Sequence, residues 1–236
     1  MNKAVSLITS IVISIGIALS GFFVGNGISN IHKFDQYISV RGLAEKQVRA
    51  NKVIWEIAYS VHGNSIKEIY SDVDRSQQEI LKFLTTVKIA ESAIQFGSPS
   101  VNLNTQTNSN KNPNGINKSS YSGYNKITVV TDKVDLIQQL SQKTNQLIAN
   151  DILISSSNLK YLYTDLNQIK PEMLNRATAN AKAVAEQFAL HANTDVGKIR
   201  QASQGLFSIN NSDDSYGDQD PNKIVRVIVN TQYFLN

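Results

Sequence analysis

Apolar and polar residues alternate along several stretches of the chain. This period of two is typical of strands that bury one face. It is clearest from Val53 to Val61, where Trp55, Ile57 and Tyr59 fall on the apolar face. Similar stretches predict further strands at residues 37–42, 93–107, 121–131, 152–164, 197–207 and 224–235. Pro99 predicts that the stretch 93–107 is broken or lies at a sheet edge.

Three stretches between the strands carry apolar residues at helical spacing instead. The first begins at Ser65, and Glu68 three residues later completes a capping box. Asp132 is the expected cap of the second helix, and Pro171 marks the start of the third. The predicted buried stripes are Ile66, Ile69, Val73, Ile80, Leu84 and Val87; Val134, Ile137, Leu140, Thr144 and Leu147; and Leu174, Ala177, Ala181, Val184, Ala185 and Phe188.

This order of elements predicts an α+β fold. We expect a largely antiparallel sheet with three main helices on one side. Polar residues at 108–122 and 209–222 predict two long loops. Residues 31–236 contain no linker rich in Pro, Gly or Ser, so they are predicted to form one domain after a separate segment at 1–30.

The amino-terminal segment is apolar. Residues 4–25 carry no charged side chain, and Lys3 precedes them. A helix of that length spans a bilayer core of about 30 Å. The preceding positive charge favours a cytoplasmic amino terminus, which predicts a single-pass inner-membrane anchor with residues 31–236 outside.

A cleaved signal peptide is the alternative to an anchor, because Ala18 and Ser20 suit cleavage before Gly21. The mature protein would then be soluble in the periplasm or associated with the outer membrane. Phe22 stands where a lipoprotein would carry cysteine, so lipidation is excluded. Gly21 and Gly25 form a GxxxG pair, which is a common motif in ordinary apolar segments as well as in helix pairs.

Composition excludes several classes of site. The 236 residues include no cysteine, so disulfides, zinc fingers, iron–sulfur clusters and thiol nucleophiles are absent. The three histidines are His32, His62 and His191, which is too few for a histidine-rich metal site. A net charge of +4, spread along the chain, does not indicate nucleic-acid binding.

Candidate chemical groups are sparse. The loop with Asp213, Asp214, Asp218 and Asp220 lacks the spacing of an EF-hand and is interpreted as a solvated polar loop. His191 and Asp195 lie near a helix end, and nothing pairs Glu45 with Glu56. No G-x-S-x-G, Walker or Rossmann motif is present. We therefore predict no catalytic, cofactor-binding or metal-binding residues, no cofactor and no enzymatic activity.

Four aromatic residues and one histidine lie on predicted strands. Trp55, Tyr59, Tyr121 and Tyr124 are expected to pack in the core, with an exposed aromatic patch as the alternative. His62 is expected to be a partly exposed strand residue.

The chain resembles the SIMPL-domain family of bacterial envelope proteins, in the branch with an uncleaved anchor. The residues that carry the resemblance are the segment Val40–Glu45, the strand Val53–Val61, Tyr124, the turn Ser155–Asn158, Gly197, Lys198, and the helix residues Asn175, Ala177, Ala181, Lys182, Ala183 and Ala185. It covers residues 37–236 and implies an α+β fold with antiparallel strands. Some members form ring-like or channel-like oligomers, and some are linked to envelope or oxidative stress. The family implies no general enzymatic activity, and the loops at 108–122 and 210–222 look like local elaborations.

Two functions remain open. The first is a non-enzymatic, membrane-anchored envelope protein that forms a homo-oligomer or binds an envelope protein partner. Its contacts would be the edge at Val101–Leu103, the loop 108–122 or the final strand. The second is a periplasmic module that binds a small ligand or another protein.

Overall fold

The computed structural model describes all residues except 1–11, 26–35, 88 and 106–118. The fold is α+β with antiparallel pairing, as predicted, but the strands form two sheets and not one. The residues divide into two compact units. The first unit comprises Met1–Glu45, Lys170–Ser208 and Arg226–Asn236, and the second comprises Lys46–Ile169 and Ile209–Val225.

The first sheet has the strand order β1-β9-β7, and a short strand, β8, also pairs with β9. These strands are β1 (Tyr37–Arg49), β7 (Val196–Gln204), β8 (Ser208–Asn211) and β9 (Asn222–Leu235). The final strand is therefore central and has a neighbour on each side. Its strict alternation places Val227, Val229 and Tyr233 on the buried face.

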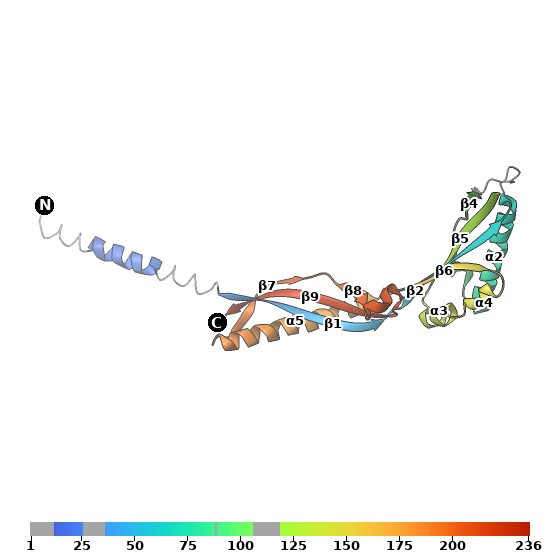
Figure 1. Cartoon of the computed structure of the whole chain (residues 1–236). Coiled ribbons are helices and arrows are strands. Elements are labelled where there is room, and N and C mark those ends of the chain that lie inside the picture. The colour runs from blue at the N-terminus through green and yellow to red at the C-terminus, as the bar shows by residue number, and fades with distance from the viewer. Residues whose placement is uncertain (1–11, 26–35, 88, 106–118) are drawn as a thin grey trace, which may run out of the picture. The chain divides into compact units, whose positions relative to one another are not determined.

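Helix α5 (Leu166–His191) lies along this sheet (Figure 1). Its buried residues recur at every fourth position: Met173, Ala177, Ala181, Ala185 and Ala189. The predicted stripe is thus correct for three alanines and wrong for Phe188, which is exposed. Pro171 lies inside the helix rather than at its start, because the helix already begins at Leu166.

The sheet of the second unit has the order β3-β5-β2-β6, with β4 also paired to β5. Its strands are β2 (Lys52–Gly63), β3 (Ile94–Phe96), β4 (Ser100–Thr105), β5 (Ser119–Thr131) and β6 (Leu153–Leu162). The break predicted at Pro99 is confirmed, since it separates β3 from β4 at one edge. A 3₁₀ turn, η1 (Glu91–Ala93), precedes β3.

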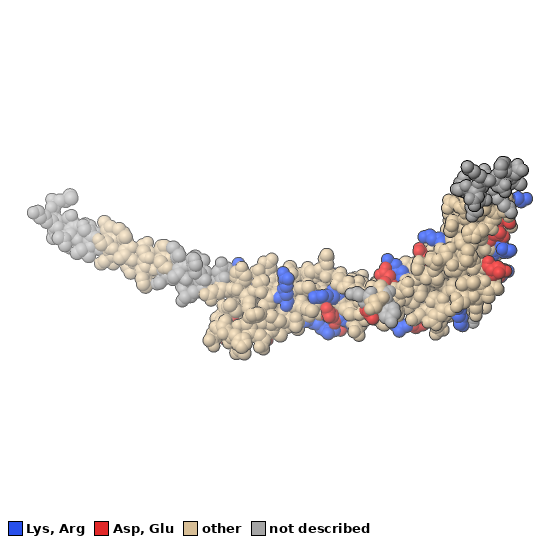
Figure 2. Space-filling view, in the orientation of Figure 1, with Lys and Arg blue, Asp and Glu red and all other residues tan. Residues whose placement is uncertain are grey.

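Three helices belong to the second unit: α2 (Ile66–Thr86), α3 (Val134–Ser141) and α4 (Asn145–Ile148). Ser65 caps α2 as predicted, by accepting a hydrogen bond from the Glu68 N–H at 3.2 Å. The Glu68 carboxylate reaches back to the Asn64 N–H at 2.8 Å. Charged residues alternate in sign along the outer side of α2 (Figure 2), where Asp72 pairs with Arg75 at 3.2 Å.

The second predicted helix differs from the structure. It is divided into α3 and α4, and Asp132 does not cap it, because α3 begins after Lys133 without a side-chain cap. Its apolar residues are nonetheless buried as predicted. They join a core of large side chains that includes Trp55, Ile57, Tyr59, Ile69, Ile80, Leu84 and Ile127.

The two predicted loops contain more structure than expected. Strand β5 already begins at Ser119, and residues 106–118 of the first loop lie outside the described residues. The second loop contains β8 and a 3₁₀ segment, η2 (Asp214–Gln219).

The amino-terminal segment is described from residue 12, as a helix over residues 12–25 with exposed apolar side chains. Within the described part of the chain, no helix combines the length and apolar character needed to cross a membrane. The anchor predicted at residues 4–25 lies partly outside the described residues and stays a prediction.

Candidate functional site

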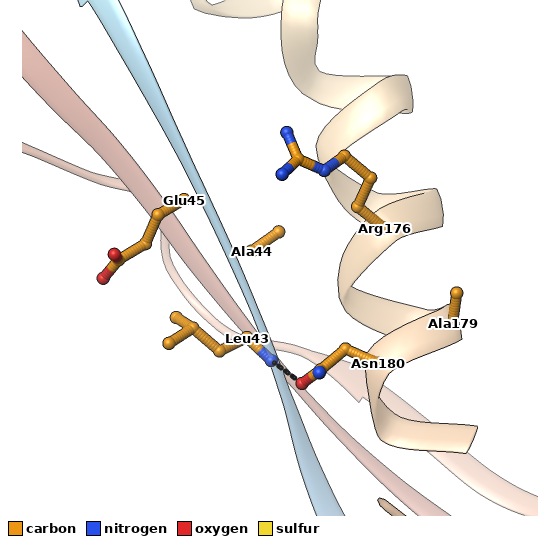
Figure 3. Close-up of a pocket in the computed structure, with 6 residues that line it drawn as sticks. All are labelled: Leu43, Ala44, Glu45, Arg176, Ala179 and Asn180. Atoms are coloured by element: carbon orange, nitrogen blue, oxygen red, sulfur yellow. Dashed lines mark hydrogen bonds between the residues drawn. The ribbon is translucent and has the colours of Figure 1, made fainter. Parts of the chain in front are cut away.

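The first candidate site is a groove in the first unit, between β1 and α5 (Figure 3). It has a volume of about 460 Å³ and is lined by Leu43, Ala44, Glu45, Arg176, Ala179 and Asn180. We call it the β1–α5 groove. Three of its lining residues come from the segment Val40–Glu45, on which the family resemblance rests.

Gly42 sets the distance between the strand and the helix. A Cβ atom at this position would lie 1.9 Å from the Ala177 carbonyl oxygen and 2.7 Å from the Ala181 Cβ. Both neighbours belong to the helix, and one is backbone, so neither can turn aside. The close approach therefore requires glycine in the strand and alanine in the helix.

Asn180 occupies the outer edge of β1. Its side-chain oxygen accepts a hydrogen bond from the Leu43 N–H at 3.0 Å. That N–H belongs to an edge strand and would otherwise be open to pairing with another strand. The charged residues of the groove have partners of their own, since Glu45 pairs with Arg226 at 3.5 Å and Arg176 with Glu172 at 3.9 Å.

The second candidate site is a cavity in the second unit, between the sheet and η2. It has a volume of about 640 Å³ and is lined by Ile54, Glu56, Asn158, Leu159, Lys160, Gly217, Asp218 and Gln219. We call it the η2 cavity. Its floor is the side of β2 and β6 that faces away from the helices, because Ile54 and Glu56 alternate with the buried Val53 and Trp55.

The floor of the η2 cavity carries opposite charges. Glu56 lies directly opposite Asn158 on the neighbouring strand, and Ile54 lies opposite Lys160. Lys126 contacts the Glu56 carboxylate at 3.4 Å, and Lys160 contacts Asp218 in the roof at 3.3 Å. The charged residues that line the cavity are thus Glu56, Lys160 and Asp218.

The roof is held in place by hydrogen bonds from backbone N–H groups to aspartate carboxylates. The Asp220 carboxylate accepts from the Asp213 N–H at 3.0 Å and from the Asn222 N–H at 2.8 Å. Asp213 in turn accepts from the Ser215 N–H at 2.8 Å, and this bond lowers the pKa of the Asp213 carboxyl. These aspartates close a loop, in keeping with the polar loop that the sequence predicts. In the described residues no group of acidic or histidine side chains is arranged to hold a metal ion.

Lys223 lies next to the roof and is 3% exposed. Its ammonium group donates to the Asn211 side-chain oxygen at 2.6 Å. Burial lowers the pKa of Lys223, while Asp218 and Asp220 act in the opposite direction. A buried lysine of this kind fixes the start of β9 against the loop.

The described residues of the second unit include a serine–histidine pair. The His62 Nδ1 and Ser122 Oγ atoms lie 3.0 Å apart, and the Asn104 side chain donates to Ser122 Oγ at 2.6 Å. Such a pair could in principle transfer a proton. However, Ser122 is 2% exposed, so its oxygen is not available to a substrate, and we interpret the three residues as a polar network across β2, β5 and β4.

The remaining predicted candidates separate into core and surface. Trp55 and Tyr59 are fully buried as expected, with hydrogen bonds to Ser157 at 2.9 Å and to the Val73 carbonyl at 3.3 Å. Burial raises the pKa of Tyr59. Tyr124 faces the other side of the sheet and is exposed, so the four aromatic residues do not form one patch. Glu45 and Glu56 belong to different units, each with its own basic partner.

Sequence reasoning missed Asn180, Ser122 and Lys223. The contact of Asn180 with Leu43 joins residues 137 positions apart and has no local signal. Lys223 did have a local sequence signal, because it alternates in phase with Val225 and Val227, which lie on the buried face of the final strand.

Comparison with known proteins gives one family match. Residues 38–226 match the family SIMPL, described as a protein of unknown function (DUF541). No curated protein matches the chain.

Solved structures give only a distant likeness. An uncharacterized conserved protein from Listeria innocua is 12% identical, with a TM-score of 0.22 over 78% of this chain and 91% of the other. Two hydrolases from the same organism are each 11% identical, with TM-scores of 0.21 over the same shares. TM-scores this low support no conclusion about fold or activity.

Proposed function

Because the chain belongs to the SIMPL family, whose function is unknown, we propose a role from the chain's own features. We propose that it is a non-enzymatic, membrane-anchored protein of the bacterial envelope that associates with copies of itself. The single observation that carries the proposal is an unprotected edge strand, β4, in the second unit.

The edges of the two sheets differ in how they are protected. Asn180 covers β1 at Leu43. Strand β7 carries Lys198 and Arg200, and its pairing with β9 shifts register twice; charges and bulges both discourage pairing with another chain. Among the residues that the structure describes, none protects strand β4 in these ways: its sequence is Ser-Val-Asn-Leu-Asn-Thr, and Leu103 is 56% exposed.

Pairing of two β4 strands would add backbone hydrogen bonds and bury Leu103 of both copies. Among the described residues, β4 pairs with β5 alone. The final strand, in contrast, lies between β1 and β7, so it offers no free edge for the contact that the sequence suggested.

The apolar amino terminus supports the anchoring part of the proposal. The helix over residues 12–25 exposes Val12, Ile17, Phe22 and Phe23. Lys3 precedes the apolar run, which favours export of residues 31–236. A membrane tether raises the local concentration of the exported part, so a weak strand-edge contact becomes sufficient for assembly.

Disulfide cross-linking tests the assembly directly. The chain has no cysteine, so any disulfide formed by a single-cysteine variant must join the introduced position in two copies of the chain. In membranes, Leu103→Cys is expected to form a covalent dimer on oxidation, because an antiparallel pair of β4 strands brings the two residues together. Leu206→Cys is the control: Leu206 is 94% exposed, outside the second unit, and should not cross-link.

Light scattering of the full chain in detergent gives the second readout. Leu103→Lys is expected to reduce the mass of the assembly, whereas Leu206→Lys leaves it unchanged. A monomeric wild-type chain, or equal cross-linking at both positions, would rule out assembly through β4.

Anchoring is tested separately. An uncleaved anchor predicts that the chain keeps the mass of residues 1–236 and resists extraction from membranes with alkaline carbonate. Loss of about twenty residues, with release into the soluble periplasmic fraction, would instead establish a cleaved signal peptide. An impermeant maleimide that labels Leu206→Cys in intact spheroplasts would place the carboxyl-terminal part outside.

The second candidate function is a module that binds a small ligand. The η2 cavity favours it, because its volume lies in the range of about 300–1,000 Å³ that is usual for ligand sites.

A further inference from the structure

The two charged residues on the floor of the η2 cavity are attached to the sheet at a defined backbone spacing. Glu56 pairs in register with Asn158, and Lys160 is two residues farther along β6. Glu56 and Lys160 are therefore diagonal neighbours on one face of an antiparallel pair. Residues in this relation have Cα atoms about 7–8 Å apart.

Both charges are loosely partnered. The contacts of Glu56 with Lys126 at 3.4 Å and of Lys160 with Asp218 at 3.3 Å exceed the roughly 2.7–2.9 Å of close charge-assisted hydrogen bonds. Each can therefore bind a further group of opposite charge. Because the floor presents one carboxylate, on Glu56, and one ammonium group, on Lys160, the cavity favours a ligand that carries both charges.

The spacing selects among such ligands. In a free amino acid the ammonium and carboxylate groups are attached to the same carbon, so they lie closer together than the Cα atoms of Glu56 and Lys160. Two extended residues span at most about 7 Å. We propose that the η2 cavity binds a dipeptide with free ends, its amino group on Glu56 and its carboxylate on Lys160. Asn158 and Gln219 would bind the peptide amide.

The cavity is formed in advance. Asp220 closes the loop that carries the roof, and Gly217 holds a backbone conformation with φ of 53° and ψ of −139°, which other residues rarely adopt. A preformed roof reduces the ordering needed on binding. The inference rests on the second candidate function, the binding module, and is independent of assembly through β4.

Calorimetric titration of the full chain in detergent tests the proposal with three probes. Alanyl-alanine is expected to bind saturably, and free alanine at least about tenfold more weakly, since a lost charged hydrogen bond is typically worth that much. N-acetyl-alanyl-alanine amide, which has neither charge, should not bind detectably. This series uses the unchanged protein, so it does not depend on whether a variant folds.

Variants then assign the site. Glu56→Gln and Lys160→Met should each weaken binding of alanyl-alanine at least about tenfold. Glu45→Gln and Lys182→Met are matched controls, because each removes one charge from an ion pair of 3.5 Å in the first unit, and binding should be unchanged.

Absence of saturable binding by the wild type, or equal binding of the blocked peptide, would overturn the proposal. So would full binding by both floor variants. Light scattering on the same samples measures the mass of the assembly, so a lack of dipeptide binding can be distinguished from a lack of self-association. Tighter binding of free alanine than of alanyl-alanine would overturn the dipeptide assignment while retaining a small-ligand module.

Discussion

The two units cover an antiparallel sheet in different ways. In the second unit the covered face holds large side chains, among them the fully buried Trp55, Ile57 and Tyr59. In the first unit the buried face of α5 is mostly alanine, and the strand beneath it contains Gly42. The second unit fills the space between its sheet and helices with large side chains, whereas the first unit brings its sheet and helix close together.

The difference predicts opposite sensitivities. A core of large side chains loses most when a side chain is truncated, because a cavity remains. A core of small side chains loses most when one is enlarged, because the backbones are already in contact. Trp55 is the one tryptophan of the chain, so its fluorescence reports on the second unit alone.

The largest expected effect is truncation in the second unit. Trp55→Ala should lower the free energy of unfolding by about 3–5 kcal/mol, through the cavity and the lost hydrogen bond to Ser157. Circular dichroism during urea unfolding measures it. Ala181→Gly, the matched truncation in the first unit, should cost only about 1 kcal/mol. Equal losses would refute the contrast between the two cores.

Enlargement of Gly42 should give the next largest effect. Gly42→Ala places a Cβ atom 1.9 Å from the Ala177 carbonyl oxygen, so α5 must move, at a cost of about 1–3 kcal/mol. We expect faster hydrogen exchange in α5 with little change in the Trp55 unfolding midpoint.

The control for Gly42→Ala is Gly63→Ala in the second unit. Its new Cβ would lie 3.1 Å from the Glu68 side chain and not against helix backbone, so a small shift of that side chain suffices and the cost should be smaller. Unchanged exchange in α5 of Gly42→Ala would show that the close contact does not limit stability.

Removal of the β1 edge cap should have a smaller effect. Asn180→Ala deprives the Leu43 N–H of its acceptor and should cost about 0.5–1.5 kcal/mol. It also opens the edge of β1, so the protein should aggregate at a lower concentration, which light scattering detects. Asn175→Ala, on the exposed surface of the same helix, is the control and should change neither property.

The smallest effect is a dependence on pH. Burial lowers the pKa of Lys223 below 10.5 in the folded state. The unfolded chain then binds more protons, so the lysine opposes folding at neutral pH, and this opposition fades as the pH rises toward 10.5. The unfolding free energy of the wild type relative to Lys223→Met should therefore increase as the pH rises toward 10.5. A constant or falling difference would contradict the burial argument.

Local patterns predicted most elements but not their partners. The alternation in β2 placed Trp55 in the core, and the capping box placed the start of α2. Period-two patterning identifies which face of a strand is buried, but it carries no information on neighbours. The division into two sheets was therefore not predictable, and neither was the central position of β9.

The candidate sites were less predictable than the fold. Gly42 is recognisable only together with Ala177 and Ala181, which are far away in sequence. The register of β2 with β6 places Glu56 and Lys160 on one face of the sheet, and Asp218, from a third segment, forms an ion pair with Lys160. Single residues of common types give no signal until the chain folds. Lys223 is different, because its phase within β9 was visible in the sequence.

The central position of β9 also constrains the order in which the chain folds. The second unit draws on a nearly continuous stretch, Lys46–Ile169, so most of its sheet can pair while later residues are still being synthesised. Strand β1 emerges first but must wait for β9, the last described strand to be made. Until then the apolar face of β1 and the helix that will cover it are without a partner. A chaperone that holds β1 during this delay would therefore improve the yield of folded protein. A premature stop before residue 222 would leave the strands of the second sheet intact but would remove β9, the central strand of the first sheet.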